Sequence, residues 1–99
     1  MRKKELKLIN YQIYKYRVYK DSYVLSLYLN FRISNYRFCK EFMYRENKFY
    51  FYELYKSYSF KTIEELSKYI LSKNSVDYTK YIPEEFLDKI LVYKFLNQC

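Results

Sequence analysis

The sequence of 99 residues has no glycine, alanine, histidine or tryptophan, and Pro83 is its only proline. Without glycine the chain has neither a Walker phosphate loop nor a dinucleotide-binding fingerprint. Without histidine it has no Ser-His or Cys-His nucleophile pair and no histidine metal ligand. Since these absences exclude much of enzyme chemistry, we expect a non-enzymatic protein without catalytic residues, cofactor or metal.

Cysteine is also scarce, because Cys39 and Cys99 are the only two and lie sixty residues apart. This spacing predicts neither a zinc site nor a disulfide framework, and it favours a reduced, intracellular setting. Lys7 and Asn10 interrupt the apolar run that a signal peptide would need after the basic start. No segment approaches the roughly 20 apolar residues that cross a bilayer. We therefore expect an intracellular protein with no membrane partner.

A chain of this length is expected to form one domain over residues 1–99. Every odd position from residue 23 to residue 33 is apolar, and Ser26, Asn30, Arg32 and Ser34 lie between or beside them, which predicts a half-buried β-strand. The apolar side of this strand consists of Tyr23, Leu25, Leu27, Leu29, Phe31 and Ile33. One face of the predicted sheet is therefore a core face.

Three short polar breaks divide residues 8–58 into four predicted strands. These breaks contain the turn-forming residues Asp21, Asn35 and Asn47, and asparagine can replace glycine where the backbone needs a positive φ. Two-residue turns at 34–35, 46–47 and 21–22 predict that Phe31 pairs with Phe38, Phe42 with Phe51 and Tyr16 with Leu27. The four strands then form one antiparallel meander.

The apolar period changes to that of a helix after residue 61. Thr62 and Glu65 form a capping box that predicts a helix over residues 62–73, and Pro83 suits the first position of a helix over residues 83–97. The predicted fold is α+β, with a four-stranded antiparallel meander sheet and two C-terminal helices packed on one face. The helices are expected to cover Leu25, Leu27, Leu29, Phe38, Phe42 and Phe51.

Charge is divided unequally along the chain. Residues 1–61 hold fourteen Lys and Arg against five acids, whereas residues 62–99 hold five against six. The uncovered sheet face is therefore predicted to be basic. Its expected cations are Lys15, Arg17, Arg32, Arg37, Arg45, Lys48 and Lys56, and its expected tyrosines are Tyr11, Tyr28, Tyr50 and Tyr52.

Cations beside aromatic rings on a sheet are typical of proteins that bind single-stranded nucleic acid. The first hypothesis is therefore single-stranded nucleic-acid binding with little sequence preference. In this hypothesis Lys15, Arg17, Arg32, Arg37 and Lys56 contact phosphates, and Tyr11, Tyr28 and Tyr52 stack on bases. Neither predicted helix carries a basic stripe, so recognition of duplex sequence is not expected.

Two other interpretations of the same face stay open. Met43, Tyr50 and Leu54, beside Tyr52, could form an apolar patch that binds a host protein or a second copy of the chain. Alternatively, the face has no specific partner, because tyrosine is a good strand former and lysine discourages edge aggregation.

The composition has sixteen tyrosines and no alanine or glycine, which indicates codon bias in an A/T-rich genome. The charged fraction of 30% suits a hot habitat and a thermostable protein, although codon drift explains it equally well. In length, in tyrosine-lysine-isoleucine bias and in its meander followed by helices, the chain resembles small orphan proteins of crenarchaeal filamentous and rod-shaped viruses, such as the Acidianus filamentous viruses. The resemblance implies expression in the cytoplasm of a hot, acidic host and interaction with that host, including the blocking of a defence system.

Overall fold

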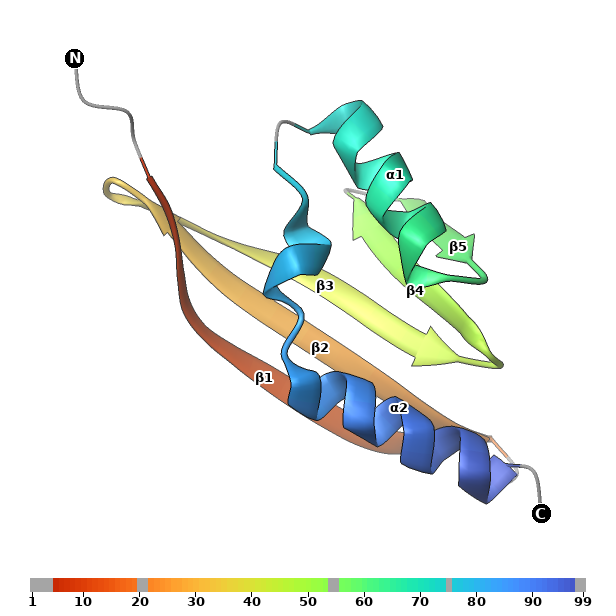
Figure 1. The fold of residues 1–99 in the computed structure, drawn as a ribbon. Helices are drawn as coiled ribbons and strands as arrows, with labels where there is room; N and C mark the ends of the chain where they lie inside the picture. The colour runs from red at the N-terminus through yellow and green to blue at the C-terminus, as the bar shows by residue number, and fades with distance from the viewer. Residues whose placement is uncertain (1–4, 20–21, 54–55, 75, 98–99) are drawn as a thin grey trace.

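The computed structural model describes residues 5–19, 22–53, 56–74 and 76–97 (Figure 1). Within them, five strands pair antiparallel in chain order and two α-helices follow. The elements are β1 (Leu6–Tyr19), β2 (Ser22–Ile33), β3 (Tyr36–Arg45), β4 (Lys48–Glu53), β5 (Lys56–Phe60), α1 (Ile63–Lys73), the short 3-10 helix η1 (Tyr78–Tyr81) and α2 (Glu84–Asn97). The α+β class and the antiparallel sheet are confirmed.

The predicted number of four strands is wrong, because the last predicted strand is divided into β4 and β5. The two strands pair antiparallel, and Glu53 lies opposite Lys56. Leu54 and Tyr55, between them in the sequence, lie outside the described residues. Neither is a turn-forming residue, so the sequence pattern contains no visible break at this point.

The turns that follow β2 and β3 set the register as expected. Ser34, Glu46 and Asn47 have φ angles of 52°, 51° and 61°, the positive values that two-residue hairpins require. Phe31 pairs with Phe38, and Phe42 pairs with Phe51. Both predicted pairings are confirmed.

The predicted register of β1 against β2 is wrong. Leu27 lies opposite Ile13 instead of Tyr16, and Tyr16 lies opposite Val24. The pairing shifts between Leu8 and Asn10 and again between Arg17 and Tyr19. Because the predicted and observed partners of Leu27 differ by an odd number of positions, residues 10–17 of β1 change face. The shift between Leu8 and Asn10 returns Lys7 to the face that the predicted register gives it.

Both α-helices cover the same side of the sheet, which we call the helix face (Figure 1). In Figure 1, α1 lies over β4 and β5, α2 lies over β1 and β2, and η1 lies between the two helices. Five of the six predicted core residues are buried and Phe38 packs partly buried against them. The helices contribute Leu66, Ile70, Phe86, Ile90 and Tyr93 to this core.

A buried carboxylate connects the helical elements. Asp77 accepts hydrogen bonds from the Ser67 hydroxyl of α1 and from the Thr79 amide, at 3.0 Å, and hydroxyl, at 2.6 Å. Burial raises the pKa of Asp77, but these hydrogen bonds, together with the charge of Lys80, outweigh it and lower the pKa below its usual value. The ionised carboxylate therefore holds η1 against α1.

Candidate nucleic-acid interface

The side chains that alternate with the core form the other side of the sheet, which we call the open face. Both helices lie on the helix face (Figure 1), so no helix or strand of the described ranges covers the open face. The open face carries, from β1 to β5, Lys7, Asn10, Gln12, Tyr14, Tyr16, Val24, Ser26, Tyr28, Asn30, Arg32, Arg37, Cys39, Glu41, Met43, Arg45, Lys48, Tyr50, Tyr52, Ser57 and Ser59.

Three cations lie side by side at one end of the open face. Lys7 pairs with Arg32, and Arg32 pairs with Arg37, so one row crosses β1, β2 and β3. All three side chains are exposed. Directly opposed residues share a face at about 5 Å between Cβ atoms, where like charges repel one another. A bound anion would relieve this repulsion.

A second pair of cations lies at the other end of the open face. Arg45 pairs with Lys48, eight residues along β3 from Arg37, which corresponds to about 26 Å of strand. The Arg45 guanidinium carbon is 5.3 Å from the centroid of the Tyr50 ring, and hydrogen bonding to Tyr50 raises the pKa of Arg45. The buried Nε of Arg45 has no hydrogen-bond partner within the described ranges.

A band of tyrosines lies between the two groups of cations. Its members are Tyr14, Tyr16, Tyr28, Tyr50 and Tyr52, and the rings of Tyr14 and Tyr16 are 49% and 42% exposed. The Tyr14 and Tyr28 ring centroids lie 5.7 Å apart in an edge-to-face arrangement. Exposed rings held by neighbouring rings are preorganised for stacking.

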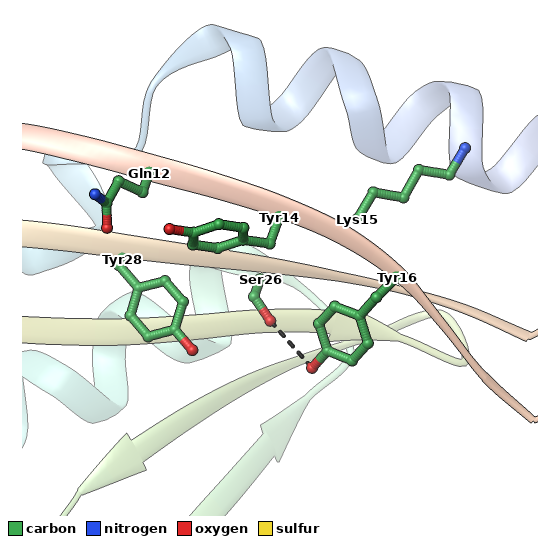
Figure 2. Close-up of a pocket in the computed structure, with 6 residues that line it drawn as sticks. All are labelled: Gln12, Tyr14, Lys15, Tyr16, Ser26 and Tyr28. Carbon is green, nitrogen blue, oxygen red and sulfur yellow. Dashed lines mark hydrogen bonds between the residues drawn. The ribbon is translucent and has the colours of Figure 1, made fainter.

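The tyrosine band borders an open pocket of about 520 Å³ (Figure 2). Gln12 and Ser26 add polar groups to it, and the Ser26 hydroxyl donates a hydrogen bond of 3.3 Å to the Tyr16 hydroxyl. Lys15 also borders the pocket, but Figure 2 shows its side chain extending away from the rings toward α2. The pocket therefore combines flat aromatic walls with one amide and several hydroxyl groups.

Glu41 is the only acid on the open face of the described strands. The Tyr28 hydroxyl donates a hydrogen bond of 3.2 Å to Glu41 Oε1. Burial raises the pKa of Tyr28 and of Tyr52, and the negative charge of Glu41 raises both further. These phenols are therefore neutral at physiological pH and add no negative charge to the face.

The structure brings together four of the eight residues predicted to bind nucleic acid. Arg32, Arg37, Tyr28 and Tyr52 lie on the open face, as expected. The other four, Tyr11, Lys15, Arg17 and Lys56, lie on the helix face.

Three of these four residues, Tyr11, Lys15 and Arg17, belong to β1 and have partners on the helix face. Arg17 donates a hydrogen bond of 2.8 Å to the Tyr23 hydroxyl, and the Lys15 ammonium lies 4.5 Å from the centroid of the Tyr23 ring. Tyr11 donates a hydrogen bond of 2.9 Å to Glu85 of α2. The changed register of β1 explains all three errors.

The sequence hypothesis assigned Lys56 to the wrong face for a different reason. Lys56 begins β5, whereas the prediction made it part of the strand that begins at Lys48. It lies opposite Glu53, two residues from Tyr58, which pairs with the buried Phe51. Side chains two positions apart on a strand share a face, so Lys56 belongs to the helix face.

The same changed register explains why the sequence hypothesis missed Tyr14 and Tyr16, whereas Lys7 was missed because it precedes residue 8, where the first predicted strand begins. Lys7, Tyr14 and Tyr16 replace Lys15, Arg17 and Tyr11 on the open face. The residue pattern carries no signal for Tyr14 and Tyr16, because a turn that leaves Tyr19 opposite Ser22 would by itself put Tyr14 opposite Leu27. The pairing shift between Arg17 and Tyr19 is what places Tyr14 and Tyr16 on the open face.

The predicted apolar patch is only partly described. Met43 pairs with Tyr50, and the Tyr52 hydroxyl donates a hydrogen bond of 3.4 Å to the Met43 sulfur. All three side chains are half-buried, and Leu54 lies outside the described residues. The open face therefore presents rings and cations more than free apolar surface.

No protein-family model, curated protein or solved structure matches the chain. Among the described residues, no three acidic or cysteine side chains gather where they could hold a metal ion. In the same ranges, neither helix has the length and apolar character needed to cross a membrane.

Proposed function

We propose that the protein binds single-stranded nucleic acid with little sequence preference through the open face. The observation that carries the proposal is the order of groups along that face, with cations at both ends and tyrosines between them. Single strands are bound by positive charge along the backbone and by aromatic rings under the bases. Both requirements are met on one uncovered surface.

In this proposal the strand follows the long direction of β2 and β3. Lys7, Arg32 and Arg37 neutralise phosphates at one end, and Arg45 and Lys48 do so at the other. The intervening length of about 26 Å accommodates several nucleotides. Stacking on an exposed ring contributes about 1 to 3 kcal/mol per base.

Low specificity follows from the side chains available to read bases. The hydrogen-bonding groups of the pocket beside Tyr14 are the Gln12 amide, the Ser26 hydroxyl, which already donates to Tyr16, and the tyrosine hydroxyls, which can donate to or accept from any base. Stacking tolerates every base, because each has an aromatic face. The helical half has no net positive charge that would favour insertion into a duplex groove.

A titration of a fluorescent single-stranded oligonucleotide tests the proposal. The wild type should bind at low salt, with a logarithmic salt slope of about −0.7 for each phosphate neutralised. The double variant R32E/R37E should bind at least about tenfold more weakly and with a flatter slope. The matched control K68E/K73E changes the net charge equally on α1, where both lysines are exposed, and should stay near the wild type.

Three results would contradict the proposal. They are an absence of wild-type binding at low salt, equal losses in the two double variants, and a wild-type dimer that Tyr50→Glu converts to a monomer. The last result would assign the open face to self-association through Met43 and Tyr50.

A further inference from the structure

The three cations at one end of the open face lie beside the turn that joins β2 to β3. We call Lys7, Arg32 and Arg37 the cation row. Arg32 pairs with Lys7 on one side and with Arg37 on the other, and only the pair of Ile33 with Tyr36 separates Arg32 and Arg37 from the turn. The cation row therefore crosses the sheet at its end.

The cation row runs across the strands, whereas the nucleic acid of the proposed function runs along them. A backbone that follows β2 and β3 crosses the row once, so one phosphate at a time lies near all three cations. An internal phosphodiester carries a single negative charge. The row consequently holds more positive charge than one internal phosphate can balance.

No acid of the described strands balances the row from within the open face. Glu41, the only acid on this face, lies four residues along β3 from Arg37, which corresponds to about 13 Å of strand. Cys39, between them on β3, pairs with Asn30. The excess charge of the row is therefore left for a ligand.

We infer that the cation row binds a phosphate monoester at one end of the nucleic-acid strand, an inference that rests on the proposed function. A phosphate monoester carries about −1.5 to −2 charges at neutral pH and presents three acceptor oxygens. The arginine forks match phosphate oxygens in pairs, and the lysine adds a point charge. In both charge and number of acceptors, a terminal phosphate fits the row better than an internal one.

A pocket of about 340 Å³ adjoins the cation row on the side of the tyrosine band. Its walls include Arg37 and the amide side chains of Asn10, Gln12 and Asn30. The Asn30 Nδ2 donates a hydrogen bond of 2.7 Å to Asn10 Oδ1, which holds these two amides in place. The terminal nucleotide can therefore lie in a polar pocket while its phosphate contacts the row and the next bases reach the tyrosines.

Competition against an internally labelled strand tests the inference. The competitors are oligothymidylates of about ten nucleotides with a 5′ phosphate monoester, with a 3′ phosphate monoester, or with neither. At about pH 7.5, one of the two terminal phosphates should raise the affinity of the wild type by at least about fivefold over the unphosphorylated strand. An unphosphorylated strand that is one nucleotide longer adds one phosphodiester and should gain less than about twofold.

Two single variants locate the gain in affinity. K7Q and K48Q each remove one exposed cation, from opposite ends of the open face, and both should weaken binding of the unphosphorylated strand. K7Q should also reduce the gain from the terminal phosphate to less than about twofold, whereas K48Q should keep it. Equal gains in the two variants would overturn the inference.

Protonation of the ligand gives an independent readout. The second pKa of a phosphate monoester is about 6, so the gain should shrink at about pH 5. Glu5, before β1, and Glu41 are present for both strands, so the ratio of the two affinities isolates the phosphate. Binding without a gain at either end, or a gain of equal size at about pH 5, would overturn the inference and leave the proposed function intact. An absence of all binding at low salt would contradict the proposed function itself.

Discussion

The two faces of one sheet differ in almost every physical property. On the helix face, Leu25, Leu27 and Leu29 are at most 1% exposed. On the open face of β2, Val24 and Ser26 are also buried, but Tyr28 is half-buried, Arg32 is exposed, and the neighbouring rings of Tyr14 and Tyr16 are exposed. Because successive side chains of a strand point to opposite faces, stability and ligand binding are assigned to alternate residues of β2. Substitutions of neighbours on this strand should therefore have separable effects.

The largest expected effect is a loss of stability when a buried side chain at the centre of the helix face is shortened. Leu27→Ala should lower the free energy of unfolding by about 2 to 5 kcal/mol, because it opens a cavity among fully buried neighbours. Its neighbour Tyr28 makes one hydrogen bond to Glu41 on the open face, so Tyr28→Ala should cost only about 0.5 to 1.5 kcal/mol. Chemical denaturation of both variants measures the difference, and equal losses would contradict the assignment of faces.

Low pH should lower the free energy of unfolding through Asp77, whose carboxylate holds η1 against α1 on the helix face. Since the pKa of Asp77 is lowered by folding, its contribution to stability is present above the unfolded value of about 3.9 and is lost as the pH falls through the folded pKa. Asp77→Ala should cost about 1 to 3 kcal/mol at neutral pH, because Ser67 and Thr79 lose their acceptor. Denaturation between pH 2 and 7 should show a flatter pH dependence in this variant than in the wild type. Parallel curves would contradict the role of Asp77.

Two exposed tyrosines of β1 provide a matched test of stacking. Tyr14 faces the tyrosine band, whereas Tyr11 hydrogen-bonds to Glu85 of α2. Tyr14→Ala should weaken oligonucleotide binding by about 1 to 3 kcal/mol with little change in the salt slope. Tyr11→Ala should leave binding unchanged and cost about 0.5 to 1.5 kcal/mol of stability. The reverse pattern would restore the original assignment of Tyr11 to the binding face.

The sequence allowed prediction of those parts of the fold in which local turn chemistry and alternation agree. The turns at Ser34 and at Glu46 and Asn47 could be recognised, and with them the pairs Phe31 with Phe38 and Phe42 with Phe51. The capping box also marked the start of α1, where the Thr62 hydroxyl accepts a hydrogen bond from the Glu65 amide.

The remaining features depend on backbone irregularities that the residue pattern does not encode. The register shift between Arg17 and Tyr19 exchanged the faces of residues 10–17, and the residue pattern did not reveal it, because tyrosines and polar residues occur on both sides of β1. The sequence consequently assigned Tyr28, Arg32, Arg37 and Tyr52 to the face on which the structure has them, and it assigned the wrong face to three residues of β1 and to Lys56 of β5. The division into β4 and β5 was missed because Leu54 and Tyr55 resemble strand residues.

The most direct measurement of the central claim compares oligonucleotide binding by two double variants that change the net charge equally. R32E/R37E alters the open face, whereas K15E/R17E alters cations that lie against Tyr23 on the helix face. If nucleic acid binds the open face, R32E/R37E should lose at least about tenfold in affinity and flatten the salt slope, while K15E/R17E should stay within about threefold of the wild type. Equal losses in the two variants, or a larger loss in K15E/R17E, would contradict binding through the open face.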